Sequence, residues 1–256
     1  MLFAQEQILI YHPGKCAGTT IEQLFLRALR QTNLARLLSE PSFNKANDQN
    51  LKPWWLEDRL RFMVGFLARR YAVQGVGGIY LQHADIYASL AIHGRELIDS
   101  LYKVAFVRNP FPRILSAFFY NSWDRKTTFR DFVLTRLESC RNLNHPFSLG
   151  HFGEIHRYTH LDGSLYVNFL GKLENIASDV DRLSREIGIP LDLARERKHA
   201  RTASSKIYRH YSEAYDEQMV EMMHRLYQKD LEYFDYQFQR EMSFHPRDRD
   251  EQTMAS

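Results

Sequence analysis

The sequence predicts an α/β fold in three layers, with a central, mostly parallel sheet flanked by helices. Short apolar segments of strand length alternate along the chain with longer segments whose apolar residues recur at helical spacing. Strands that alternate with helices form mostly parallel sheets with helices on both faces. The 256 residues suit one large domain with a modest insertion, and 44% hydrophobic residues can build a substantial core.

The first strand and helix are predicted around a loop that contains glycine. Residues 8–11 (ILIY) form a short apolar run of the kind found in buried strands. After the loop PGKCAG, apolar residues recur at helical spacing, which predicts a helix. These apolar positions are Ile21, Leu24, Phe25, Ala28 and Leu29.

Two further strands are predicted before the middle of the chain. Residues 79–81 (IYL) form one and are followed at once by Gln82 and His83. Residues 103–107 (KVAFV) form the next, which ends at Arg108. Pro112 then suits the first turn of a helix, where no amide donor is needed.

The second half of the chain predicts one more strand and two helices. Residues 165–170 (LYVNFL) read as a strand, and residues 176–187 as a helix that ends before Gly188. The last long helix is predicted over residues 212–234, with Ser212 as its N-cap.

The domain boundaries follow from these elements. We expect one domain over residues 1–242 and a polar tail over 243–256. The domain contains a variable helical insertion at about residues 30–78, in which residues 41–77 include an amphipathic segment rich in arginine and aromatic residues.

Composition narrows the range of functions. The net charge of +3 fits an anionic ligand held in one site better than a nucleic-acid surface. The only two cysteines, Cys16 and Cys140, do not form a disulfide framework, so we expect a reducing, cytoplasmic location. No run of about 18 apolar residues is present, so no membrane span is expected.

Three side chains of functional interest follow the ends of the predicted strands. Lys15, His83 and Arg108 each come directly or shortly after a strand. Ligands of parallel α/β sheets bind beyond the carboxyl ends of the strands. The sequence therefore predicts two cations and one imidazole at a single edge of the sheet.

The loop after the first strand is suited to an anion. The start of a helix offers free amide groups and a partial positive charge, and Gly18 lets the backbone approach a ligand closely. Thr19 and Thr20 add hydroxyl donors, and Lys15 adds a full charge. In the standard nucleotide-binding loop the lysine follows the last glycine and an Asp elsewhere helps to hold Mg²⁺. Here Lys15 precedes Gly18 and the strand 103–107 ends in an arginine, so a group that reacts without a metal, such as a sulfuryl group, fits better.

Four segments resemble the sulfotransferases, especially the carbohydrate sulfotransferases with an HxPKxAGTT-like signature. The loop HPGKCAGTTIEQLF resembles their 5′-phosphosulfate loop, and FVRNPFPRILSAFF resembles their 3′-phosphate segment. FLGKLENIASDVDRLSREIGIPL and YRHYSEAYDEQMVEMMHRLYQKDLEYFDY resemble later segments of the same family, in the same order. The resemblance implies a P-loop-like fold. This chain departs from the pattern where Pro13-Gly14-Lys15 replaces x-Pro-Lys.

The resemblance implies 3′-phosphoadenosine-5′-phosphosulfate as the sulfuryl donor, with no metal required. Lys15 would contact the bridging and sulfuryl oxygens, and Arg108 and Ser116 would bind the 3′-phosphate. Arg113 competes for the latter role, but is interpreted as structural or as a support for the residues that bind. The donors to the 5′-phosphate would come from Cys16, Ala17, Gly18, Thr19 and Thr20. A basic loop over residues 197–211 would close over the nucleotide through Thr202, Ser204 and Lys206. Cys16 is given no catalytic role, although a thiol at a helix start can have a lowered pKa and be sensitive to oxidation.

His83 is the candidate general base. An imidazole is neutral near pH 7 and can take the proton of an acceptor hydroxyl, and the resemblance implies a histidine at this strand end. His12, His151 and Glu22 are weaker candidates, and Asp85 could orient His83.

These observations predict transfer of a sulfuryl group to a hydroxyl acceptor. The resemblance favours a carbohydrate or glycolipid acceptor, and Trp54 and Trp55 in the segment 41–77 could stack on a sugar or could equally pack in the core or at a dimer surface. Two alternatives stay open: a nucleotide kinase of the P-loop type, and a non-catalytic nucleotide-binding protein on the same fold.

Overall fold

The central sheet has the predicted mostly parallel arrangement. The computed structural model describes residues 2–3, 7–31, 84–120, 127–141, 150–194 and 207–240. The sheet contains β1 (Leu2–Phe3), β2 (Ile8–Tyr11), β3 (Tyr102–Val107) and β6 (Phe169–Lys172), in the order β1-β2-β3-β6. Strands β2, β3 and β6 are parallel and β1 is antiparallel to β2. The predicted α/β fold is therefore confirmed.

The register makes the three parallel strands end at one edge. Tyr11 at the end of β2 pairs with Ala105 in β3, and Val107 at the end of β3 pairs with Lys172 at the end of β6. The residues that follow β2 and β3 consequently leave the sheet side by side.

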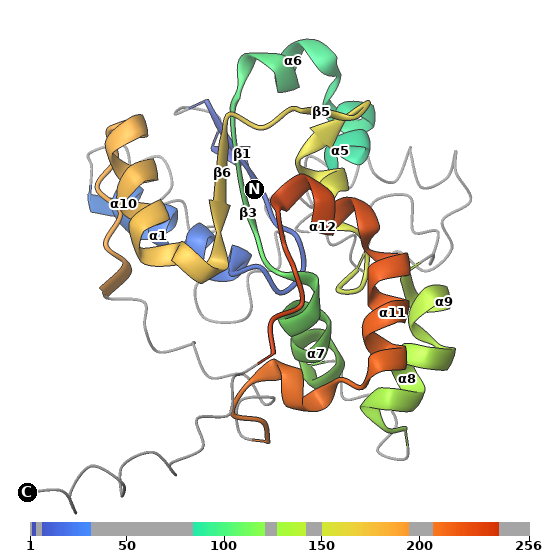
Figure 1. Cartoon of the computed structure of the whole chain (residues 1–256). Helices are drawn as coiled ribbons and strands as arrows, with labels where there is room; N and C mark the ends of the chain where they lie inside the picture. The colour runs from blue at the N-terminus through green and yellow to red at the C-terminus, as the bar shows by residue number, and fades with distance from the viewer. Residues whose placement is uncertain are drawn as a thin grey trace, which may run out of the picture.

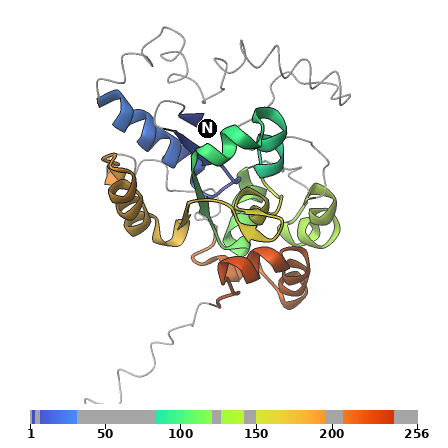
Figure 2. The same cartoon turned by 90° about the horizontal axis from the view of Figure 1, so that it is seen from above.

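One face of the sheet is covered by α1 (Gly18–Gln31) and α10 (Ile176–Ile187), which lie next to each other in both views (Figures 1 and 2). Ile8 and Ile10 point to this face, because side chains alternate along a strand. They pack with buried apolar residues of both helices, which include Phe25, Leu29 and Leu183.

The other face is covered by α5 (Ile86–His93), α6 (Arg95–Ser100) and the 3-10 helix η2 (Ile155–Tyr158). Leu9 and Tyr11 of β2 pack here with Ile86, Ile98 and Tyr158. The sheet is thus buried on both faces, which explains the uninterrupted apolar runs of β2 and β3.

A layer of helices packs beyond the carboxyl edge of the sheet. It contains α7 (Pro110–Tyr120), α8 (Phe129–Thr135), α9 (Leu137–Arg141), α11 (Glu217–Leu226) and α12 (Gln228–Phe234). Figure 1 shows α7 continuing from the lower end of β3, and Phe118 of α7 packs against Phe129 and Phe132 of α8. These helices share one apolar cluster, which also includes Cys16 and Val107.

Two sequence predictions are wrong in their boundaries. The strand predicted over 165–170 is divided: Ser164–Leu165 (β5) pairs with His160–Leu161 (β4) in a small hairpin, and β6 starts at Phe169. Asn168 separates them, since its amide and its side-chain oxygen bond the carbonyl and amide of Lys103.

The helix predicted over 212–234 consists of three pieces. These are the 3-10 helix η6 (Tyr211–Ala214), α11 and α12. Asp216, not Ser212, caps α11 by accepting a hydrogen bond from the amide of Met219. An acidic N-cap in the middle of a helical pattern restarts the helix there.

The remaining predictions divide into confirmed and untested ones. The strand 8–11 and the helix 176–187 are confirmed, and Gly188 follows that helix with the positive φ expected of a C-terminal glycine. The strand 79–81 and the segment 41–77 lie outside the described residues. No helix in the described part of the chain has the length and apolarity to cross a membrane.

Candidate functional site

The loop between β2 and α1 curls so that its backbone can face an anion. Lys15 and Ala17 both have positive φ angles, 65° and 63°. Where left-handed residues alternate with right-handed ones, the backbone amides form a concave arrangement that binds anions. The first amides of α1 also have no acceptor within their own helix. Thr19 is exposed in this first turn and Thr20 is half-buried. The backbone conformation of the loop is therefore suited to an anionic group.

Gly18 is required by a neighbour in the chain. A Cβ atom at Gly18 would lie 1.9 Å from Cδ2 of His12, so the imidazole packs directly on the glycine. The Nδ1 atom of His12 lies 3.2 Å from Oε1 of Glu22, and both side chains are buried. The His12 and Glu22 side chains thus pack against the loop in the protein interior. Their burial does not favour either residue as the base for an acceptor hydroxyl.

Arg108 joins the loop from the end of β3. Its Nη1 atom donates to the carbonyl of Lys15 at 3.4 Å. Glu174 braces the same strand end, because its carboxylate accepts from the amide of Asn109 at 2.9 Å and from the hydroxyl of Tyr236 at 2.8 Å. The structure therefore brings Lys15 and Arg108 together, as expected from their positions after parallel strands.

Ser116 supplies a polar atom that needs a partner. It lies in α7 and is 1% exposed, and its hydroxyl oxygen has no hydrogen-bond partner among the described residues. A buried hydroxyl without a partner is destabilising by about 1–3 kcal/mol. A phosphate oxygen that accepted from Ser116 would remove this penalty, so the residue fits the 3′-phosphate role that the resemblance implies.

The electrostatics of the loop favour an anion. Burial lowers the pKa of Lys15, and the nearby Arg108 lowers it further. Burial likewise lowers the pKa of Arg108. A bound anion would oppose both effects, because it stabilises the charged forms of its neighbours.

A second wall of the site comes from the segment 150–156. Gly14 lies so close that a Cβ atom there would be 2.8 Å from Cδ2 of His151. The His151 ring meets the Tyr120 ring edge to face at 5.0 Å, and the Lys15 ammonium lies 3.8 Å from the centre of the Tyr120 ring. His151 and Lys15 thus contact the same Tyr120 ring.

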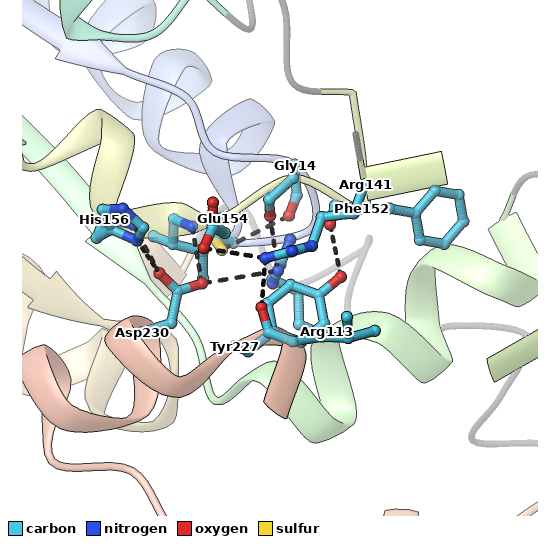
Figure 3. Close-up of polar contacts among 12 residues, drawn as sticks. Gly14, Arg113, Arg141, Phe152, Glu154, His156, Tyr227 and Asp230 are labelled. Carbon is cyan, nitrogen blue, oxygen red and sulfur yellow. Dashed lines mark hydrogen bonds and ion pairs between the residues drawn. The ribbon is translucent and has the colours of Figure 1, made fainter. Parts of the chain in front are cut away.

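Buried polar side chains hold this wall in place (Figure 3). Arg113 donates to the carbonyls of His151 and Gly153 at 3.1 and 2.8 Å, and Tyr227 donates to that of Phe152 at 2.6 Å. Arg113 is 1% exposed, and its bonds to these carbonyls support the backbone of this wall.

Asp230 is the acidic centre of the same network. It is fully buried in α12 and accepts from the amides of Ile155 and His156, both at 2.8 Å. Its carboxylate also lies 2.9 Å from Nδ1 of His156 and 3.9 Å from Nη2 of Arg113. Figure 3 shows Arg113 and Asp230 reaching the segment from two different helices.

His151 is neutral over the physiological range. Burial, followed by the charges of Lys15, His12 and Arg113, lowers the pKa of His151 from 6.5 to about 4. A neutral imidazole can accept or donate a hydrogen bond at this wall.

Several predicted site residues either lie outside the described residues or have other partners. His83, Thr202, Ser204 and Lys206 lie outside the described residues, so their roles stay predictions. Asp85 caps α5 through the amide of Ala88 and pairs with Arg157 at 2.8 Å, so it has partners other than the predicted histidine.

The suggested sensitivity of Cys16 to oxidation is wrong. Its thiol is fully buried and donates weakly to the carbonyl of Gly14, and burial raises its pKa to about 12. Its amide donates to the carbonyl of Pro13 at 3.3 Å. Reactive cysteines are exposed thiolates, and Cys16 is neither.

Two residues that the sequence analysis missed had a detectable signal. Tyr120 follows Ser116 by four positions in a predicted helix, which places both on one face. Asp230 occupies an apolar position of its helix, four residues after Leu226 and four before Phe234. A charged residue on an apolar face indicates a buried polar contact.

Comparison with known proteins gives one match. The sequence model described as "Sulfotransferase family" matches residues 2–237. No curated protein and no solved structure matches the chain. No group of three or more metal-ligating side chains occurs among the residues that the structure describes.

Replacing Asp230 by Asn tests the buried network. Loss of the carboxylate leaves the Arg113 charge buried without compensation, and we expect the free energy of unfolding to fall by about 3 kcal/mol. The matched control is Asp216→Asn, which removes an exposed ion pair with Arg130 but retains an N-cap, and should cost less than about 1 kcal/mol. Urea unfolding measures the loss of unfolding free energy in both variants. Equal losses would show that the buried network contributes no more to stability than the exposed ion pair does.

The lowered pKa of His151 predicts a dependence of stability on pH. The unfolded chain takes up the proton more readily than the folded one, so stability falls as the pH drops from 6.5 towards about 4. For a pKa difference of this size the loss approaches about 3 kcal/mol. Urea unfolding across this range should give a shallower dependence for His151→Asn than for the unmodified protein, and identical slopes would contradict the assignment.

Proposed function

Because the chain belongs to the sulfotransferase family, we propose that Lys15, Arg108 and Ser116 bind its sulfuryl donor at the carboxyl edge of the sheet. Membership implies an enzyme that transfers a sulfuryl group from 3′-phosphoadenosine-5′-phosphosulfate to a hydroxyl acceptor. The main support for this proposal is the hydrogen bond from Arg108 to the backbone carbonyl of Lys15. This bond brings together two cationic residues that follow the ends of two parallel strands.

The donor has two anionic ends, and the site offers two sets of donors. The 5′-phosphosulfate would meet Lys15 and the amides of Ala17 and Gly18 at the start of α1. The 3′-phosphate would meet Arg108, whose guanidinium can donate two parallel hydrogen bonds, and the unpartnered hydroxyl of Ser116.

The residues have separate roles in the proposed transfer. The acceptor oxygen forms a bond to sulfur while the bond from sulfur to the 5′-phosphate oxygen breaks, which leaves a sulfate ester and adenosine 3′,5′-bisphosphate. Lys15 and the first amides of α1 stabilise the negative charge that grows on the leaving phosphate. The acceptor proton passes to a base, for which His83 stays the candidate.

The acceptor that we propose is a carbohydrate or glycolipid hydroxyl. The support is the HPGKCAGTT loop, which resembles that of carbohydrate sulfotransferases, and the two tryptophans Trp54 and Trp55, whose rings could stack on a sugar. We also propose a cytoplasmic location, supported by two cysteines that are both free.

Replacing Lys15 by Ala tests the transfer reaction. The purified protein is incubated with donor labelled in the sulfuryl group and a panel of hydroxylated sugars, and labelled product is measured. Loss of one preorganised donor to the leaving group should lower kcat by about 100-fold or more. Lys229→Ala, which removes an exposed lysine from α12, is the control and should keep full turnover. Absence of transfer by the unmodified protein, or full turnover in Lys15→Ala, would overturn this role.

Replacing Arg108 by Ala tests binding of the 3′-phosphate. Hydrogen bonds to charged groups are worth about 1.5–3 kcal/mol, so the affinity for adenosine 3′,5′-bisphosphate should fall by about 10- to 100-fold. Calorimetry measures the affinity, with Arg95→Ala as the control, since Arg95 pairs with Asp99 on the surface of α6. Unchanged affinity in Arg108→Ala would exclude this contact.

A further inference from the structure

Tyr120 is an exposed aromatic residue beside the loop lysine. It ends α7, and 62% of its surface is exposed. The Lys15 ammonium lies over the face of this ring, 3.8 Å from its centre.

The contact with the Tyr120 ring stabilises the charged form of Lys15, which its surroundings otherwise disfavour. The lysine is half-buried, and both burial and Arg108 disfavour its charged form. The face of an aromatic ring carries partial negative charge and attracts an ammonium group. The Tyr120 ring therefore stabilises the charged form without adding an acid that would repel an anionic ligand.

The ring is itself held from the side. His151 meets it edge to face, with an angle of 75° between the ring planes. His151 in turn packs on Gly14, and its carbonyl accepts from the fully buried Arg113. A chain of contacts thus connects the buried network around Asp230 to the ammonium group of Lys15.

We propose that Tyr120 is a positioning residue that holds the Lys15 ammonium at the mouth of the loop, with His151 fixing the plane of the ring. A lysine has a flexible four-carbon stem and many rotamers, so a preset position makes its charge available where the leaving phosphate develops. The inference rests on the proposed role of Lys15 in transfer.

The test compares two substitutions of the same residue. Tyr120→Leu removes the aromatic face but keeps an apolar side chain, and Tyr120→Phe keeps the face and removes only the hydroxyl. Kinetics with labelled donor should show that Tyr120→Leu lowers kcat by about 10-fold, in line with a partly desolvated cation–π contact. The KM for the donor should change by less than about twofold, because a positioning effect acts on the transition state. Tyr120→Phe should recover kcat to within about threefold of the unmodified protein.

A matched control exists at the opposite edge of the sheet. The Lys103 ammonium lies 5.1 Å from the centre of the Tyr166 ring, near the amino end of β3. Tyr166→Leu removes this second lysine–tyrosine contact away from the site, and kcat should stay unchanged. Thermal unfolding of each variant shows whether the protein measured is folded.

The outcomes separate this inference from the proposed function. Wild-type kcat in Tyr120→Leu, an equal loss in Tyr120→Phe, or a loss confined to KM would overturn the positioning role while the transfer activity stands. An equal loss in Tyr166→Leu would overturn it too, since the effect would then be general. No transfer by the unmodified protein, or full turnover in Lys15→Ala, would instead overturn the proposed function.

Discussion

Two cations held side by side at the carboxyl edge of a parallel sheet are the constraint on which the rest of the site depends. Lys15 and Arg108 follow neighbouring strands, and Arg108 bonds the backbone of the loop that carries Lys15. Burial lowers the pKa of both residues, and their proximity lowers that of Lys15 further. The fold maintains this unfavourable pairing through the strand register and through Glu174, which fixes the amide after Arg108. An anionic donor is the ligand that turns the repulsion into attraction.

The helices beyond the sheet give the loop its second wall. Arg113 from α7 and Asp230 from α12 hold the backbone of the segment 150–156, and this segment presents His151 to Gly14 and Tyr120. The Arg113 and Asp230 side chains are buried, so they can fix the wall with little freedom of movement. The packing of the helical layer thus influences where the Lys15 ammonium group lies. This relation connects the stability of the fold to the proposed chemistry.

The sequence predicted the parts of the molecule that local patterns determine. The strand 8–11, the loop after it and the helix 176–187 are recognisable because periodicity and glycine positions act within a few residues. The strand predicted over 165–170 was wrong because Asn168 pairs with Lys103, a contact that no local pattern reveals. Glu174 was missed for the same reason, since its partner Asn109 comes from a distant part of the chain. His83 and the loop 197–211 stay predictions, because the described residues do not include His83 or the predicted nucleotide contacts of that loop.

We propose above all that the carboxyl edge of the sheet binds a doubly phosphorylated adenosine through protein cations and amides alone. The most direct measurement is calorimetric titration in the presence of a chelator, with adenosine 3′,5′-bisphosphate compared with adenosine 5′-phosphate. We expect tight binding of the bisphosphate and an affinity at least about 10-fold lower for the nucleotide that lacks the 3′-phosphate. Equal affinities for the two nucleotides, or tight binding of ATP that appears only when magnesium is restored, would contradict it.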